Sequence, residues 1–363
     1  MVSAAPFTFT QAHFRLGFVP LVDAAPLVVA AHRGFFAQHG LRVDLVPCAS
    51  WASLRDRLAF GVLEGAAMLA PMPIATNLGL GGVEANLRVI GTLSHNGNAI
   101  TLGARLLQEI RWAAPGLCDQ RPLPAKALAA ALAARREAGR EKPTLAVVFP
   151  FSSHNYLLRD WLASAGIDPE RDVRLVVVPP PQVAERLAAD EIDGFCAGAP
   201  WSSRAVALRA GEMVCITAEI WPDHPEKILA VRDECLETRQ SGLIALMAAL
   251  SKAGAWLDRA EADDLTEAAR LLSTHGGLAM PVATIAGVLA GRIITAPDHA
   301  PVDFAPFRFS KLAPDPAHGL RWLREMRRWG HVPEDTQDAL IDRIWTNHIW
   351  QQTFACQEVS SCI

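Results

Sequence analysis

The chain has 363 residues, of which 51% are hydrophobic and 20% are charged, and its net charge is −4 at pH 7. This composition is typical of a globular protein rather than of a disordered chain, and the length is comfortable for two lobes. The acidic balance argues against a nucleic-acid-binding protein, which ordinarily carries a basic face, so we expect no direct nucleic-acid partner.

The first residues lack the features of an export signal. Residues 1–13 contain no lysine or arginine and no apolar core, and no cysteine stands near the start as a lipid attachment point. The longest uncharged apolar stretch, residues 278–291, is broken by Pro281 and is shorter than the roughly 18 residues of a membrane span. We therefore expect a soluble protein in the cytoplasm, with no membrane partner.

The cysteine pattern agrees with a reducing compartment. The chain has seven cysteines, which are scattered and include no Cys-x-x-Cys pair. This arrangement predicts neither a disulfide framework nor a zinc site. Cys356 and Cys362 leave a weak metal or redox feature open, although an incidental position in a loosely held tail is the more ordinary interpretation. We expect no cofactor and no resident metal.

The predicted elements begin with a strand that starts at Phe14, followed by a helix that ends at Gly40 and a second strand in "LRVDLVPC". The segment "WASLRDRLAFGVLEGAAML" predicts another helix leading into a short strand near residues 66–69. A further strand follows in "LRVIGTLS". This alternation predicts a mostly parallel sheet with helices on both faces.

A second α/β unit follows a change of composition. Residues 106–143 form a helical, alanine-rich and charged insertion, and a new strand–helix–strand unit begins at "TLAVVFPFSSHNYLLRDWL". We predict an inserted second lobe at residues 101–200, and a discontinuous first lobe at residues 14–100 and 201–363 with mostly helical C-terminal residues. Crossings near residues 98–104 and 197–201 would place a ligand cleft between the lobes.

Catalytic motifs are not found. The sequence has no Gly-x-Ser-x-Gly, no P-loop, no Gly-x-Gly-x-x-Gly after the first strand and no His-Glu-x-x-His. Its eleven histidines show no metal-ligand spacing. We predict a binding protein rather than an enzyme.

Three residues at strand–helix junctions suggest binding. Trp51 and His154 each stand at the start of a predicted helix, where free N–H groups favour an anion, and Lys227 opens a predicted strand. Each has an ordinary interpretation as well, respectively as a packing residue, a partly exposed cap residue and a solvated charge. On the residues alone, the chain is a two-lobed ligand-binding protein with an anion as a candidate ligand.

Several longer blocks resemble a known family. They include "GFVPLVDAAPLVVAAHRGFFAQHGL", "SWASLRDRLAFGVLEGAAMLAPMP", "FPFSSHNYLLRDWLASAGIDP", "DGFCAGAPWSSRAV" and "WPDHPEKILAVR". The chain resembles the nitrate- and bicarbonate-binding proteins of bacterial ABC transporters over roughly residues 14–350. The resemblance implies a type II periplasmic-binding-protein fold, in which two α/β lobes close on one anion.

The resemblance also implies a set of ligand-binding residues. Carried over to matching positions, these are Trp51, a side-chain amide at Asn98, His154, the backbone near Gly198, and Lys227. An indole N–H, a histidine N–H, an amide and one ammonium can satisfy the three oxygens of a flat monovalent anion.

Two comparisons within that family bear on the identity of the anion. The bicarbonate binders have an acidic residue where Lys227 stands and a calcium ion beside the ligand, so His154 and Lys227 favour nitrate or nitrite here. The transporter proteins have glutamine where Asn98 aligns, and the shorter amide leaves the pocket slightly wider. Nitrate and nitrite therefore both stay open.

The expected lack of an export signal points to a cytoplasmic nitrate/nitrite sensor. In the related sensors of nitrate assimilation operons, the anion-free protein holds an ANTAR-domain RNA-binding antiterminator and releases it on ligand binding. The C-terminal third and residues 106–143 are candidate docking surfaces. The alternative is an exported ABC-transporter component with a missed signal sequence. The sequence also leaves open an enzyme of thiamine-pyrimidine synthesis and a sensor for another oxyanion or an aliphatic sulfonate.

Overall fold

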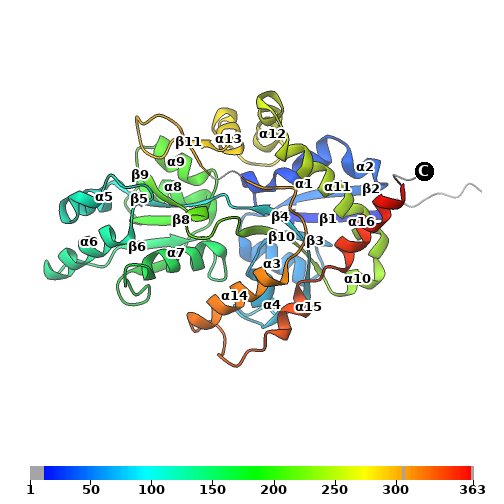
Figure 1. Cartoon of the computed structure of the whole chain (residues 1–363), viewed down its shortest axis with the longest axis horizontal. Coiled ribbons are helices and arrows are strands. Elements are labelled where there is room, and N and C mark those ends of the chain that lie inside the picture. Colours follow the sequence, from blue (N-terminus) through cyan, green and yellow to red (C-terminus); the bar gives the residue numbers. More distant parts are fainter. Residues whose placement is uncertain (1–11, 305–306, 361–363) are drawn as a thin grey trace, which may run out of the picture.

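Two five-stranded sheets divide the molecule into two lobes that lie side by side (Figure 1). The computed structural model describes residues 12–304 and 307–360. Cys362 lies outside the described residues, and the side chain of Cys356 is not described. The two α/β lobes and the helical C-terminal region confirm the predicted fold class.

The first sheet has the strand order β2-β1-β3-β10-β4. Its bounds are β1 Ala12–Phe18, β2 Leu41–Pro47, β3 Gly65–Leu69, β4 Leu87–His95 and β10 Pro225–Arg232. The first three strands are parallel, whereas β10 runs antiparallel to both of its neighbours, β3 and β4. Apart from β2, these strands are largely buried, because helices cover both faces of the sheet.

The helices of the first lobe come from both ends of the chain (Figure 1). The predicted helix that ends at Gly40 is interrupted at Gly34, whose φ of 72° is readily adopted by glycine. The bounds are α1 Ala25–His32, α2 Phe35–Gln38, α3 Trp51–Ala59, α4 Met72–Asn77, α10 Glu234–Thr238, α11 Gln240–Asp258, α12 Ala262–Thr274, α13 Val282–Leu289, α14 Pro316–Arg328, α15 Ala339–Ile344 and α16 His348–Ser360.

The second sheet has the strand order β7-β6-β8-β5-β9. Its strands are β5 Asn98–Gly103, β6 Thr144–Val147, β7 Arg174–Val177, β8 Gly194–Gly198 and β9 Gly211–Ile216, and its helices are α5 Ala104–Ala113, α6 Ala125–Glu137, α7 Ser153–Ala163, α8 Val183–Ala188 and α9 Trp201–Ala207. The alanine-rich insertion forms α5 and α6, whose leucines pack in one core with Ile100 and Leu145.

Both sheets are mixed, which corrects the expectation of a mostly parallel sheet. Strand β4 runs toward the cleft and β10 runs away from it, so the pair is antiparallel. In the second lobe β5 leaves the cleft, whereas β8 and β9 end there, so β5 is antiparallel to both. The mixed pairing follows from a chain that crosses between the lobes twice.

The two crossings lie next to each other. The first is the short step from His95 to Asn98, and the second runs from Ile216 to Pro225. The second crossing was predicted near residues 197–201, but β9 follows that point and adds to the edge of the second sheet beside β5. The backbone N–H of Asn96 donates to the carbonyl of His224 at 3.0 Å, so the crossings are hydrogen-bonded to each other.

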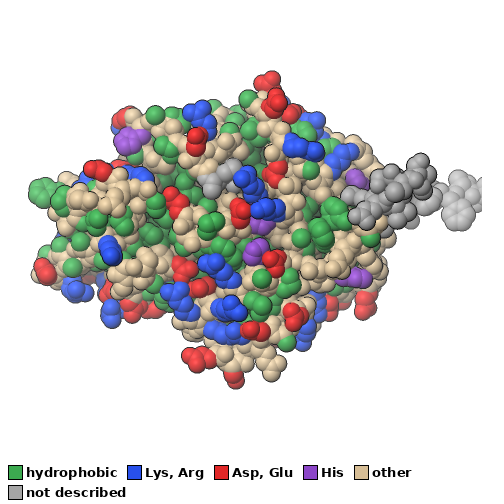
Figure 2. Space-filling view, in the orientation of Figure 1, with side chains coloured by type: hydrophobic (Ala, Val, Ile, Leu, Met, Phe, Trp, Pro, Cys, Tyr) green, Lys and Arg blue, Asp and Glu red, His purple; other side chains and the backbone are tan. Residues whose placement is uncertain are grey.

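The surface carries mixed charge. On the face shown in Figure 2, lysine and arginine side chains are interspersed with aspartate and glutamate. Within the described residues, no helix combines the length and the apolar character that a bilayer crossing requires.

Candidate anion-binding site

The five predicted site residues lie where the two lobes meet. Trp51 begins α3, Asn98 begins β5, and His154 lies in the first turn of α7. Gly198 ends β8, and Lys227 lies near the start of β10. All five are buried, and the side chains of His154 and Lys227 are 0% and 2% exposed. The structure therefore brings together residues that the sequence spreads over 177 positions, from 51 to 227.

Trp51 presents an indole N–H that is unused within the described structure. Ser50 caps α3 by accepting the N–H of Ser53 at 3.2 Å, which fixes Trp51 at the first helical position. The Nε1 atom is buried and makes no hydrogen bond to any described residue. The Lys227 ammonium lies 5.0 Å from the centre of the Trp51 ring, within the range of a cation–π interaction.

His154 also presents an unused polar atom to the site. Ser152 caps α7 through a 3.0 Å bond from the Asn155 N–H, and this cap places Ser153 and His154 in the first turn. The His154 Nε2 atom is buried without a hydrogen bond in the part of the chain that is described. Burial lowers the pKa of His154 to about 3, so the imidazole is neutral near pH 7.

Gly198 lies opposite Asn98 in the β5–β8 pair and leaves space beside it. A Cβ atom at Gly198 would lie 3.4 Å from Asn98 Oδ1 and 3.6 Å from His154 Nε2. A side chain at this position would therefore stand between two of the predicted ligand-binding groups. Glycine keeps the backbone of β8 open to a small ligand.

Lys227 is paired with two buried carboxylates. Its Nζ atom lies 2.7 Å from Asp23 Oδ2 and 2.8 Å from Glu226 Oε1. Burial by itself would lower the pKa of Lys227, but Asp23 and Glu226 raise it above the ordinary value. The ammonium is therefore charged, and the pairing compensates for its removal from water.

Glu226 connects the groups of the two lobes. Its Oε2 atom accepts hydrogen bonds from Asn98 Nδ2 at 2.6 Å and from Ser153 Oγ at 2.5 Å. His154 Nε2 lies 3.7 Å from Oε1, and His224 Nδ1 lies 3.6 Å from Oε2. Burial would raise the pKa of Glu226, but Lys227 and the two histidines lower it to about 2. The carboxylate is thus ionised and surrounded by donors.

Comparison with known proteins assigns the chain to a family. Residues 9–273 match the NMT1-like family, which is more than half of the chain. The chain belongs to the NMT1-like family. It is related to the nitrate- and bicarbonate-binding proteins of ABC transporters, as the sequence resemblance predicts.

Individual relatives agree with the NMT1-like assignment. The nitrate/nitrite binding protein NrtA of Nostoc sp. is 30% identical over 350 residues, covering 93% of this chain and 76% of that protein. The crystal structure of the periplasmic nitrate-binding protein NrtA from Synechocystis PCC 6803 superposes with a TM-score of 0.85 at 27% identity, covering 96% of this chain and 90% of that one. These NrtA relatives are binding proteins rather than enzymes, as the sequence predicts for this chain.

The chain also matches part of a longer protein. The nitrate import ATP-binding protein NrtC of Synechocystis sp. is 36% identical over 336 residues, covering 87% of this chain. The match spans only 46% of the length of that relative. This chain is therefore similar to only part of NrtC.

Sequence reasoning missed several residues of the site. Glu226 adjoins Lys227, and neighbouring side chains of a regular strand point to opposite faces, so the strand pattern does not predict both residues in one site. Register shifts between β10 and β4 on both sides of Lys227 break that alternation. Asp23 could have been noticed, because it is an acidic residue inside the apolar run "FVPLVDAAPLVV".

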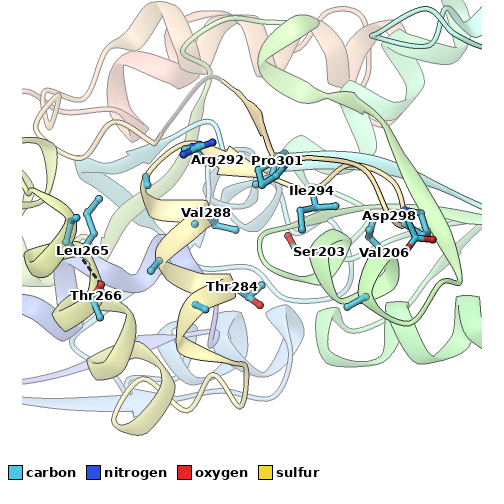
Figure 3. Close-up of a pocket in the computed structure, with 18 of the residues that line it drawn as sticks. Ser203, Val206, Leu265, Thr266, Thr284, Val288, Arg292, Ile294, Asp298 and Pro301 are labelled. Atoms are coloured by element: carbon cyan, nitrogen blue, oxygen red, sulfur yellow. Dashed lines mark hydrogen bonds between the residues drawn. The ribbon is translucent and has the colours of Figure 1, made fainter.

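A separate cavity opens between α9 of the second lobe and α12 and α13 of the first (Figure 3). It has a volume of about 700 Å³, and none of the five predicted site residues lines it. Its walls are mainly apolar and include Val206, Leu265, Val288 and Ile294. The buried polar cluster, rather than this apolar cavity, has the chemistry of an oxyanion site.

Proposed function

We propose that this chain binds nitrate or nitrite at the buried cluster between its lobes. The observation that carries the proposal is the pair of unused buried polar atoms, Trp51 Nε1 and His154 Nε2, beside the Lys227 ammonium. A buried donor without a partner is unfavourable, so this arrangement calls for a ligand that accepts hydrogen bonds. The names of the NrtA relatives support nitrate and nitrite as that ligand.

The chemistry of the cluster favours a small planar monoanion. The indole N–H and a neutral histidine can each donate one hydrogen bond, and Asn98 contributes an amide. Lys227 supplies one positive charge, although it is already shared between Asp23 and Glu226. A divalent anion would add two negative charges to this buried group, which is strongly unfavourable.

Calorimetric titration tests the proposal. Nitrate or nitrite should bind in the micromolar range and chloride and bicarbonate more weakly. His154→Leu, which keeps a similar volume without a donor, should bind roughly tenfold more weakly, because a hydrogen bond to a charged group contributes about 1.5 kcal/mol or more. His275→Leu changes an exposed histidine that directly follows α12, away from the cluster, and should bind as the unmodified chain does. No heat with nitrate or nitrite would rule out the proposed ligands.

The biological setting is a separate part of the proposal. The relatives favour a substrate-binding component of a nitrate ABC transporter, which was the alternative interpretation of the sequence. The cytoplasmic sensor that holds an ANTAR-domain antiterminator rests on the sequence resemblance and stays a prediction. Both settings use the same anion site, because each requires only that ligand binding favours closed lobes.

Cell fractionation and partner capture distinguish the two settings. A sensor should remain in the cytoplasm, and the purified protein should hold an ANTAR-domain protein until nitrate is added. A transport component should be recovered outside the cytoplasm and should show no nitrate-dependent release of such a partner.

A further inference from the structure

A carboxylate already occupies two of the donors of the proposed anion site, Asn98 and Lys227. Glu226 is fully buried and accepts hydrogen bonds from Asn98 and Ser153, while its other oxygen contacts Lys227 at 2.8 Å. Of these groups, Asn98 and Lys227 are the ones that an incoming nitrate would use. An anion and the ionised Glu226 therefore compete for these two donors, whereas Trp51 Nε1 and His154 Nε2 are free of Glu226 hydrogen bonds.

The charges of the cluster make the competition stronger. Asp23 and Glu226 contribute two negative charges and Lys227 one positive charge, while burial keeps His154 and His224 neutral near pH 7. The sum, −2 + 1, leaves one net negative charge in a group that is almost completely buried. A bound monoanion would raise this to two uncompensated negative charges, which a buried site does not tolerate.

We propose that Glu226 takes up a proton when the anion binds, so that the site binds an anion and a proton together. Protonation removes one negative charge and turns one carboxyl oxygen from an acceptor into an O–H donor that can face the anion. It also releases the Asn98 amide and the Lys227 ammonium for the ligand. The inference rests on the proposed function and identifies Glu226 as a residue that sets the affinity and pH dependence of binding.

Other titratable groups face Glu226 from the surrounding elements. They are Asp23 from the turn before α1, His154 from α7, Cys196 from β8, His224 from the crossing before β10, and Lys227 beside it. Asp23 takes up a proton more easily than Glu226, because burial raises the pKa of Asp23 to about 6 even though Lys227 opposes that rise. Among the described contacts, however, Asn98 and Ser153 donate to a carboxylate oxygen of Glu226 and not of Asp23. The ionised form of Glu226 is therefore the one that keeps these donors from a ligand.

Calorimetry in buffers with different ionisation enthalpies measures the proton count directly. Titration of nitrate into the unmodified chain between pH 6 and pH 8 should show uptake of close to one proton. By linkage, the affinity should then fall about tenfold for each unit of pH increase. Nitrate binding without proton uptake would overturn this inference and leave the proposed function intact, whereas no nitrate binding would contradict the proposed function itself.

Three variants assign the proton to its residue. Glu226→Gln should bind nitrate at least tenfold more tightly than the unmodified chain at pH 8, with little proton uptake. Asp23→Asn should keep the proton uptake, because the Glu226 carboxylate still accepts from Asn98 and Lys227 in this variant.

Asp223→Asn is the control. It neutralises an exposed carboxylate near the same crossing, at a left-handed backbone conformation that asparagine also adopts. It should match the unmodified chain. Uptake that persists in Glu226→Gln would overturn the assignment, and circular dichroism checks that each variant is folded.

Discussion

Buried donors at single residues decide what this site can hold. Trp51 Nε1 and His154 Nε2 are both enclosed without a hydrogen bond to the described residues, although buried polar atoms are usually paired. Each side chain stands in the first turn of a helix whose start is capped by a serine, so the backbone that carries the donor is held in place. The proposed site therefore offers two donors to an incoming acceptor.

Trp51→Phe tests the indole donor without removing the ring. The variant keeps an aromatic face beside Lys227 but loses the N–H, so nitrate affinity should fall roughly tenfold, corresponding to about 1.5 kcal/mol. Any loss of stability should come from the smaller ring in a buried position, because the lost N–H has no partner among the described residues. Trp345→Phe removes another buried indole N–H, beside Gly319, and should leave the affinity unchanged. Equal affinities for Trp51→Phe and the unmodified chain, measured by calorimetry, would remove Trp51 from the site.

Gly198→Ala tests the space between the lobes. The added methyl group would meet Asn98 and His154 at ordinary contact distances of 3.4 Å and 3.6 Å, so the protein should fold normally. Because the methyl group occupies the space that a small anion would use, nitrate affinity should fall roughly tenfold or more. Gly116→Ala, at a position with open space around the new atom, is the matched control. Unchanged calorimetric affinity in Gly198→Ala would show that the ligand lies elsewhere.

At the level of elements, the start of α7 connects a helix cap to the proposed anion site. Ser152 accepts the Asn155 N–H at 3.0 Å and donates to the Phe149 carbonyl at 2.7 Å. These two bonds hold the first turn, from which Ser153 reaches Glu226 and His154 faces the site. A change in the cap should therefore affect both folding and affinity.

Ser152→Ala should lower the free energy of unfolding by about 1–2 kcal/mol and also weaken nitrate binding. Asp315→Ala removes the cap of α14, where Asp315 accepts the Ala317 N–H at 2.8 Å, and should lower stability by a similar amount with unchanged affinity. Denaturant unfolding and calorimetry measure the two quantities. If Ser152→Ala loses stability but keeps full affinity, the position of α7 does not control the site.

Over the whole molecule, the C-terminal region holds the two lobes together beside the site. The segment after α14 contacts α7, because Tyr156 and the Nδ1 atom of His331 share a hydrogen bond of 2.9 Å. The Arg159 guanidinium lies 5.3 Å from the Trp329 ring, and Arg328 pairs with Asp160. The helix that carries His154 is thus attached to the first lobe as well as to its own.

Tyr156→Phe should make the closed arrangement less stable. The variant loses a bond between lobes worth about 1 kcal/mol, so a smaller closed fraction should weaken nitrate binding by roughly fivefold. Small-angle scattering should show a larger radius of gyration than for the unmodified chain without nitrate, and the same radius at saturation. If both proteins have equal radii and affinities, this contact does not control closure.

The sequence predicts the architecture better than the chemistry of the site. Alternating strands and helices predict two α/β lobes, but the antiparallel places of β10 and β5 depend on where the chain crosses between the lobes. The sequence predicts the positions of Trp51, His154 and Lys227 at the starts of helices and a strand. Their expected roles in ligand binding come from the family resemblance. The alternation of a regular strand places Glu226 on the face opposite Lys227, so the sequence does not predict it in the site. Its hydrogen bond with Asn98 also joins residues that are 128 positions apart.

A crystal structure of the chain with nitrate tests the central claim most directly. We expect one anion between the lobes, within hydrogen-bond distance of Trp51 Nε1, His154 Nε2 and Lys227 Nζ. Nitrate bound only outside this cluster, for example in the apolar cavity between α9 and α13, would contradict it.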